Sequence, residues 1–127
     1  FMDKVKSNSP FESVIGFSRA TRTGNIVAIA GTAAIGDDGK TVGVNNPLEQ
    51  TRRCFEIIKN ALAEFNLGLD SVFRSRVFFI NRDDWNEIAK GHGEVFSEIK
   101  PASSFLIVDG FIDPEWLVEI EVDAWIK

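Results

Sequence analysis

The sequence predicts a single α+β domain in which two helices cover one face of a largely antiparallel or mixed β-sheet. Two observations support this fold class. Two segments carry apolar residues at helical spacing, and the remaining apolar segments are short and alternate as strands do. Their order is strand, strand, helix, strand, helix, strand, strand, which is typical of an α+β domain. A chain of 127 residues supplies one hydrophobic core, so we expect one domain over residues 1–127.

The first two strands are predicted to form a hairpin. Residues 1–10 are mostly polar and end in a proline, so we expect them to be a loose lead-in. Segments 17–22 and 26–30 then flank residues 23–25, which contain a Gly-Asn turn signal. The second arm is apolar on both faces, which indicates a central position in the sheet.

The first helix is predicted from the spacing of its apolar face. Its members recur at intervals of three and four: Leu48, Thr51, Phe55, Ile58, Leu62 and Phe65. Asn45 or Asn46 is expected to cap its start, Pro47 suits the first turn, and residues 66–68 end it.

The second helix is predicted to open at Asp84, which has the spacing of a capping box with Glu87. Its apolar stripe consists of Trp85, Ile88, His92, Val95 and Ile99. Gly91 and Gly93 lie inside it, and each costs roughly 1 kcal/mol relative to alanine. Further strands are expected over 72–80, 104–108 and 117–125.

The last strand carries acidic side chains on one face. Glu119, Glu121 and Asp123 alternate with apolar residues and therefore point the same way. One interpretation is a solvated outer face. The other is a carboxyl group near apolar surface, with a raised pKa suited to general acid or base catalysis. Arg76 on the strand over 72–80 is expected to pair with Glu119 or Glu121.

Composition excludes several classes of function. The net charge of −5 argues against nucleic acid as a partner, because phosphate binding requires a basic surface. One histidine and one cysteine argue against a zinc site, and the single cysteine fits a reducing cytoplasm. No apolar run approaches the roughly 18 residues of a membrane span, and no signal-peptide pattern is present, so we expect no membrane association.

Few isolated residues point to chemistry by themselves. His92 lies on an apolar helix stripe, where the structural interpretation is a hydrogen-bonded core residue and the alternative is a ligand contact. Cys54 is expected to be an unreactive residue that packs beside the apolar face of its helix. Ser103 and Ser104 follow a Pro-Ala corner whose backbone N–H groups suit an anion, but no serine-hydrolase motif surrounds them.

Short motifs in a fixed order carry a family resemblance. They are Ile15-Gly16, Gly24-Asn25, Gly31, Gln50-Thr51-Arg52, the segment 66–72, Asp84-Trp85, Pro101-Ala102 and the segment 118–121. From about residue 15 to residue 125 the chain resembles the Rid (YjgF-type) reactive-intermediate deaminases. The resemblance implies a chorismate-mutase-like α+β fold and a homotrimer with ligand clefts between subunits. It also implies hydrolysis of 2-imino or enamino acids without metal or cofactor.

The resemblance also implies which residues form the site. Glu119 matches the position that orients the attacking water, and Gly31 matches the glycine that ends a strand. Ser103 stands where active members have the arginine that clamps the substrate carboxylate. At other site positions the chain has Phe17 for tyrosine, Ala30 for serine, Ala89 for asparagine and Phe105 for cysteine. His92 stands at a further tyrosine position and is a candidate replacement polar group.

These replacements predict a changed ligand. Ser103 offers no charge, so a 2-imino acid should bind weakly unless Arg19, Arg22, Arg74 or Arg76 reaches the cleft. We therefore expect a Rid-like homotrimer that binds a small, mostly apolar metabolite, with Glu119 directing water if the protein is a metal-free hydrolase of imines or enamines. One alternative is a non-catalytic binding or regulatory trimer. Another is the endoribonuclease (L-PSP) activity with which some relatives are labelled.

Overall fold

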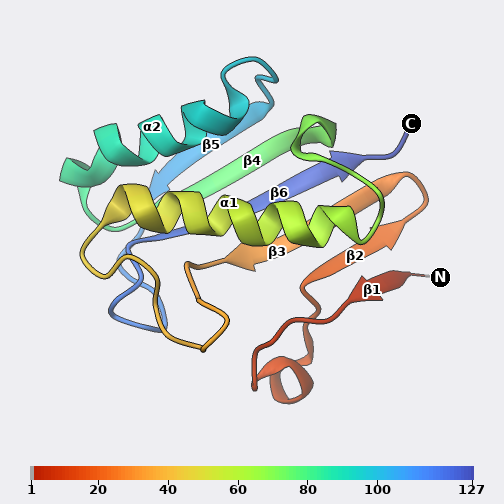
Figure 1. Cartoon of the computed structure of the whole chain (residues 1–127), viewed down its shortest axis with the longest axis horizontal. Coiled ribbons are helices and arrows are strands. Elements are labelled where there is room, and N and C mark those ends of the chain that lie inside the picture. Colours follow the sequence, from red (N-terminus) through yellow and green to blue (C-terminus); the bar gives the residue numbers. More distant parts are fainter. Residues whose placement is uncertain (1) are drawn as a thin grey trace.

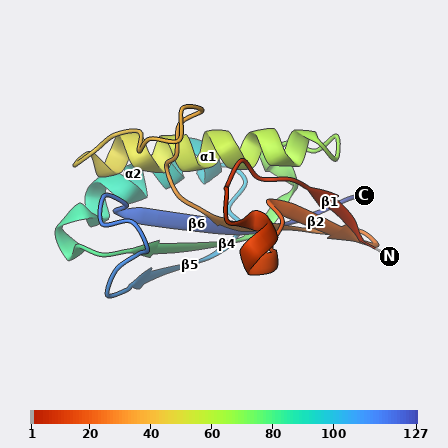
Figure 2. The same cartoon turned by 90° about the horizontal axis from the view of Figure 1, so that it is seen from below.

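A computed structural model describes residues 2–127 and shows a six-stranded mixed sheet with two helices on one face (Figures 1 and 2). The strands are β1 (Asp3–Val5), β2 (Ala20–Thr23), β3 (Ile26–Thr32), β4 (Val72–Phe79), β5 (Ala102–Ile107) and β6 (Val118–Trp125). They lie in the order β1-β2-β3-β6-β4-β5, and within the described residues every neighbouring pair is antiparallel except β4 and β5. The predicted fold class is confirmed.

The predicted hairpin forms between β2 and β3. Gly24 has φ +58°, a left-handed conformation that a two-residue hairpin turn requires and that glycine adopts without strain. The lead-in needs correction, because Asp3–Val5 pairs with β2 as an edge strand. Beyond the lead-in, Glu12–Gly16 forms a π-helical turn. The first residue of the predicted lead-in lies outside the described residues.

The first helix, α1 (Pro47–Ala63), begins where the sequence predicts. Asn46 is the cap, and its side chain accepts a hydrogen bond of 3.0 Å from the backbone N–H of Glu49. The helix ends two residues before the last apolar position of its stripe. Asn66 then adopts φ +58° and turns the chain toward β4.

The second helix, α2 (Trp85–Phe96), does not begin with the predicted capping box. Asp84 makes no capping hydrogen bond through its side chain. A 3₁₀ turn over Arg82–Asp84 leads directly into the helix, so Asp84 already has helical backbone angles rather than the extended angles of a cap. Within residues 2–127, no helix is both long and apolar enough to span a bilayer.

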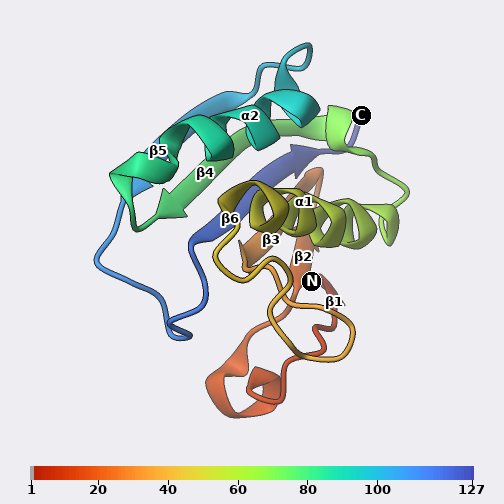
Figure 3. The same cartoon turned by 60° about the vertical axis from the view of Figure 1, so that its left-hand side comes forward.

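The core fills the space between the helices and the sheet. The strands contribute alternate side chains to it, including those of Val77 on β4 and Ile120 on β6, both fully buried. The helix α1 crosses β3 and β6, whereas α2 lies along β4 and β5 (Figure 3). This arrangement separates an inner sheet face, covered by helices, from an outer face that the described chain leaves uncovered (Figure 2).

One boundary affects the site directly. Strand β5 begins at Ala102, two residues before the predicted start, because it pairs in parallel with β4 from Arg74 onward. Ser103 is therefore a strand residue opposite Ser75 rather than part of a corner. Since opposed residues of paired strands point to the same face, Ser103 shares the inner face with the buried Ser75.

Candidate functional site

The sheet divides the predicted site residues into two groups. Glu119, Gly31 and Ala30 lie on or beside the outer face, on β3 and β6. The others belong to the inner side, at the edge formed by β5 and α2: Ala89, His92, Ser103 and Phe105. Within one subunit these two groups lie on opposite sides of the sheet.

Glu119 occupies a confined place beside Gly31. A methyl group at Gly31 would lie 3.6 Å from Oε1 of Glu119, an ordinary van der Waals distance, so the carboxyl group lies directly beside this glycine. Burial raises the pKa of Glu119, and the positive charge of Arg19 opposes that shift. Among residues 2–127, Glu119 forms no side-chain hydrogen bond and no ion pair, so its oxygens remain available to a water molecule or a ligand.

Arg19 supports the backbone on which this group rests. Its Nη2 donates to the carbonyl oxygens of Ala30 and Gly31, both at 2.8 Å. Its Nε is buried and lacks a hydrogen-bond partner among the described residues. Arg19 thus holds the end of β3 and places positive charge near Glu119.

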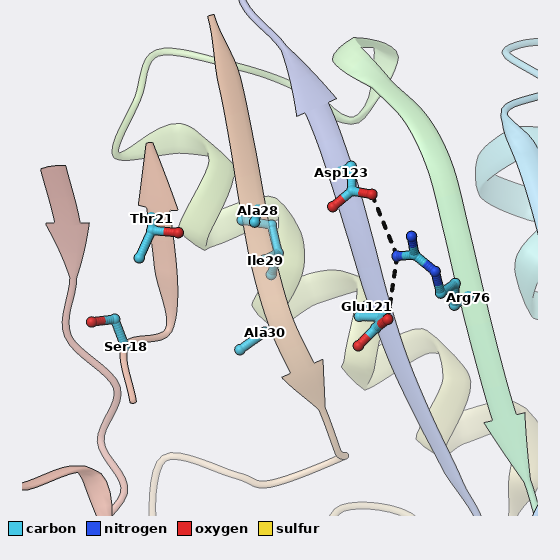
Figure 4. Close-up of a pocket in the computed structure, with 8 residues that line it drawn as sticks. All are labelled: Ser18, Thr21, Ala28, Ile29, Ala30, Arg76, Glu121 and Asp123. Carbon is cyan, nitrogen blue, oxygen red and sulfur yellow. Dashed lines mark hydrogen bonds and ion pairs between the residues drawn. The ribbon is translucent and has the colours of Figure 1, made fainter. Parts of the chain in front are cut away.

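A shallow hollow of about 350 Å³ lies on the same outer face (Figure 4). Ser18, Thr21, Ala28 and Ala30 line one side, and the opposite side is an ion-paired cluster. In that cluster Nη1 of Arg76 lies 3.2 Å from Glu121 and 3.4 Å from Asp123. The predicted cross-strand pair with Glu121 is confirmed, and the alternative pair with Glu119 is wrong for the described chain. The register explains this, because Arg76 is directly opposite Glu121, whereas Glu119 is opposite Phe78.

Phe17 lies next to this outer face. It follows the π-helical turn, is half-buried, and lines a second hollow together with Lys4, Lys6 and Ser18. Ser18 lines both hollows, so Phe17 borders the surface that carries Ala30. The aromatic ring brings apolar surface to this region and no hydroxyl.

On the inner side, three polar side chains form a continuous chain of hydrogen bonds. His92 Nε2 is 2.9 Å from Ser75 Oγ, and Ser75 Oγ is 2.7 Å from Ser103 Oγ. Ser103 donates in turn to the carbonyl oxygen of Pro101 at 2.9 Å. Ser75 is fully buried, whereas Ser103 is exposed at the edge of the sheet. The chain therefore connects the interior to the surface.

Aromatic rings surround this polar chain. The rings of Phe105 and Phe96 each lie 4.9 Å from the His92 imidazole, between ring centroids, and Trp85 packs edge-on against Phe105 at 5.0 Å. Ala89 is one turn from both Trp85 and His92 and so belongs to the same side of α2. Burial in this apolar setting lowers the pKa of His92. His92 is thus a hydrogen-bonded packing residue, as the structural interpretation predicts, and it borders the exposed edge.

The four arginines proposed as substitutes for the missing clamp have other positions. Arg74 and Arg76 alternate with Ser75 on β4 and so point away from the face that carries Ser103. Arg22 donates to the carbonyl oxygen of Gly24 in the hairpin turn. Arg22 is opposite the buried Val27 and so lies on the inner side, but β3, β6 and β4 separate its strand from β5. Arg19, the fourth arginine, is bonded to the end of β3. Within one subunit, none of the four lies beside Ser103.

Sequence reasoning missed Ser75. Its signal was available, because a serine stands alone among apolar residues on the buried face of its strand while the only histidine lies on the apolar stripe of a helix. A buried hydroxyl needs a partner, and the histidine is the natural one. Among residues 2–127 no group of three His, Cys, Asp or Glu side chains is arranged to hold a metal ion. Cys54 is buried, and burial raises the pKa of its thiol far above the ordinary value, as expected of inert packing.

Comparisons of the sequence and the fold with known proteins identify relatives of this chain. The family model described as endoribonuclease L-PSP matches residues 7–126. An uncharacterized protein of Streptomyces coelicolor is 40% identical over 122 residues, which cover 96% of this chain and 90% of that protein. A Mycobacterium tuberculosis member of the YjgF/YER057c/UK114 family has a crystal structure that superposes with a TM-score of 0.88 at 36% identity, covering 99% of this chain and 100% of the other. A Rid family protein of Yersinia pestis shares the fold, with a TM-score of 0.88 at 23% identity, covering 99% of this chain and 100% of the other.

Proposed function

Because this chain belongs to the endoribonuclease L-PSP (YjgF/Rid) family, we propose that it forms a homotrimer that binds a small, mostly apolar metabolite in clefts between subunits. In each cleft Glu119 activates water for the hydrolysis of an imine or enamine. The single cysteine supports a reducing, cytoplasmic setting for this activity.

The main support for the proposal is the position and the raised pKa of Glu119, together with its carboxyl group, which is unpaired among the described residues. Its carboxyl group lies beside Gly31, has a raised pKa, and is not engaged by Arg76, which binds Glu121 and Asp123 instead. A carboxylate whose pKa is raised toward neutrality is a better proton acceptor than an ordinary one. In an ion pair, the same carboxyl group would have a lowered pKa, and its oxygens would be occupied by the partner rather than by water.

The proposed reaction needs one carboxylate and one water molecule. Water adds to the carbon of the C=N bond while Glu119 takes a proton from the water. The carboxyl group then returns that proton to the nitrogen, which gives a carbinolamine. Glu119 next takes the proton of the new hydroxyl group and passes it to the amine nitrogen, so that the C–N bond breaks, ammonia leaves and a carbonyl compound remains. The balance is imine plus water giving carbonyl plus ammonia, with no redox step.

The division of the site supports clefts between subunits. Glu119 and Gly31 lie on the outer face, whereas Ser103 and Phe105 lie on the inner side of the edge strand. One ligand can contact both groups only if the outer face of one copy meets the β5 edge of another. Head-to-tail contacts of this kind form a closed ring when the rotation between copies is a third of a turn, which is the arrangement of a trimer.

Ser103 stands where related proteins have a carboxylate-binding arginine, and this replacement supports a ligand without a carboxylate. An Arg–carboxylate contact contributes about 1.5–3 kcal/mol, and a neutral serine cannot supply it. Phe17, Ala30, Ala89 and Phe105 further reduce the polarity of the site. We therefore place the substrate among neutral imines and enamines with small apolar substituents.

The test compares two freshly generated substrates, propan-1-imine and 2-iminobutyrate, which differ by a carboxylate. Wild-type protein should accelerate hydrolysis of the neutral imine, and Glu119→Gln should lower that rate by about 10²–10⁴-fold, the range of a general base. Ser103→Arg should raise activity on 2-iminobutyrate by about 10- to 100-fold, the equivalent of the restored contact. If wild-type protein already hydrolyses 2-iminobutyrate as fast as Ser103→Arg, the ligand has not changed and the proposal is wrong.

A second candidate, a trimer that binds the same ligand without turning it over, is favoured by the neutral residue at position 103. It predicts that Glu119→Gln retains the ligand and that wild-type protein leaves both imines at their spontaneous rates. Cleavage of RNA has less support, because the chain has a net charge of −5.

A further inference from the structure

The hydrogen-bond chain from His92 to Ser103 can have only one direction. The carbonyl oxygen of Pro101 has no hydrogen, so the bond to it uses the single hydroxyl hydrogen of Ser103. Ser103 must then accept from Ser75, which uses the single hydrogen of Ser75. With both hydroxyl hydrogens committed, Ser75 can only accept from His92, so Nε2 of His92 carries a hydrogen.

This direction holds in both protonation states of the histidine. Imidazolium donates from both nitrogens, and the neutral ring with a hydrogen on Nε2 donates from that nitrogen. The chain is thus anchored at one end by a carbonyl group that never donates and at the other by a nitrogen that always does. Ser103 is left with one free lone pair and no free hydrogen.

We infer that Ser103 presents a hydrogen-bond acceptor to the cleft and selects ligands with a neutral donor group, such as a hydroxyl, an amide N–H or an enamine N–H. The inference rests on the proposed function, because it specifies the ligand of that same cleft. A carboxylate has only lone pairs and would face the lone pair of Ser103 with no hydrogen between them. The site therefore disfavours the carboxylate as well as lacking a clamp for it.

The surroundings explain why the preferred donor is neutral. Phe105 lies two residues after Ser103 on β5 and packs against His92, and Trp85 packs against Phe105. These rings offer a charged group no hydrogen-bond partner to replace its hydration. In the proposed cleft, where a second copy covers this edge, an ammonium group would lose more hydration than one hydrogen bond returns. An amide or hydroxyl loses less.

The tautomer of His92 tests the direction of the chain without any ligand. The sequence contains one histidine, so its imidazole nitrogen signals in a ¹⁵N-labelled protein need no assignment by mutation. Above the pKa of the ring, we expect Nε2 to carry the hydrogen and Nδ1 to be the bare nitrogen. A neutral ring with its hydrogen on Nδ1 would reverse the chain and overturn the inference.

A second experiment tests whether Ser103 selects ligands with a neutral donor group. The probes are isobutyramide, isobutanol, isobutylamine and isobutyrate, which share a carbon skeleton, and the readout is the shift of the Ser103 amide signal on titration. Isobutyramide and isobutanol should bind most tightly. Ser103→Ala should weaken isobutyramide binding about 2- to 10-fold, the range of one neutral hydrogen bond, and Ser103→Arg should make isobutyrate the preferred probe.

Ser104→Ala is the matched control, because Ser104 is the exposed neighbour on the other face of the same strand, and binding should be unchanged. If isobutyrate or isobutylamine binds wild-type protein as well as the amide does, the inference is overturned while the cleft remains. If none of the four probes shifts the signal, the proposed cleft is overturned and the inference with it. If the protein hydrolyses the neutral imine but does not prefer the neutral donor probes, only the inference about Ser103 is wrong. The two proposals can therefore fail separately.

Discussion

At the scale of single residues, Glu119 gives the folded protein a distinctive response to pH. Its pKa is raised above the ordinary value of 4.5 by burial, so the folded state holds the proton more tightly than the unfolded chain. Stability contributed by the protonated group is present below that value and falls as pH rises through the folded pKa. Glu119→Gln should remove this loss, so that the variant gains stability relative to wild-type protein as pH increases from 4.5 upward.

Urea unfolding at a fixed protein concentration over a series of pH values measures the effect. Glu121→Gln is the control, because that carboxylate is ion-paired with Arg76 and its loss should not produce the same gain. Parallel pH profiles for wild-type protein and Glu119→Gln would contradict the raised pKa.

For His92 we expect the opposite dependence of stability on pH. Burial lowers its pKa from 6.5, so the unfolded chain binds the proton more readily than the folded state does. The contribution of the neutral ring is complete above 6.5 and is lost as pH falls through the folded value. Thermal unfolding between about pH 8 and about pH 5 should therefore show a larger drop in Tm for wild-type protein than for His92→Gln. An equal drop in both proteins would mean that another group causes the acid sensitivity.

Sequence reasoning succeeded for residues whose neighbours follow from strand alternation. The face shared by Glu119, Glu121 and Asp123 was predictable from alternation alone. Which carboxylate Arg76 would bind was not, because that depends on a register between strands 45 residues apart. Arg19 was considered only as a substitute clamp. Its bonds to the carbonyl groups of Ala30 and Gly31 could not be foreseen, because they arise where a bulge interrupts the pairing of β3 with β6.

At the scale of elements, the two glycines of α2 form a matched pair for mutation. A methyl group at Gly91 would lie 2.6 Å from Cγ2 of Thr51 on α1, so the glycine sets how closely the helices approach. Thr51 is buried and its hydroxyl donates to the carbonyl oxygen of Pro47, so it cannot easily move aside. At Gly93 nothing lies within 4 Å of the same added atom.

Gly91→Ala should therefore destabilise the protein, because about 1–3 kcal/mol of overpacking exceeds the gain of about 1 kcal/mol in helix propensity. Gly93→Ala should stabilise it by up to about 1 kcal/mol, since propensity is the dominant change. Chemical denaturation of both variants measures the difference. Equal effects of the two substitutions would show that helix contact does not distinguish these positions.

Element boundaries were predictable where a local signal exists. The start of α1 follows from the cap and proline at Asn46 and Pro47, and the structure has it there. Strand β1 was missed, because three residues are too few to show periodicity and their partner strand begins at Ala20. The early start of β5 was missed for a similar reason, since pairing with β4 determines it rather than its own composition. That error changed the interpretation of Ser103 from a corner residue to a strand residue.

At the scale of the whole molecule, the two groups of site residues lie on opposite sides of the sheet. The resemblance implied clefts between subunits, but neither composition nor spacing indicated two groups of site residues on opposite sides of a sheet. The parallel pairing of β5 with β4 reveals this division, because it fixes Ser103 on the inner side and leaves Glu119 on the outer side. The proposed site, assembled from two copies, would make the function dependent on association.

Mixed trimers test that dependence directly. One subunit type carries both Ser103→Arg and Glu119→Gln, so it has the clamp and lacks the base; the other is wild-type and has the base without the clamp. Each type alone should hydrolyse 2-iminobutyrate poorly. After the two are unfolded together and refolded in equal amounts, about a quarter of the head-to-tail interfaces should join the introduced arginine of one subunit to Glu119 of the next. Activity should then rise to about a quarter of that of the Ser103→Arg trimer, which serves as the positive control. A site contained within one subunit has no such interface and would leave the mixture no more active than its two components.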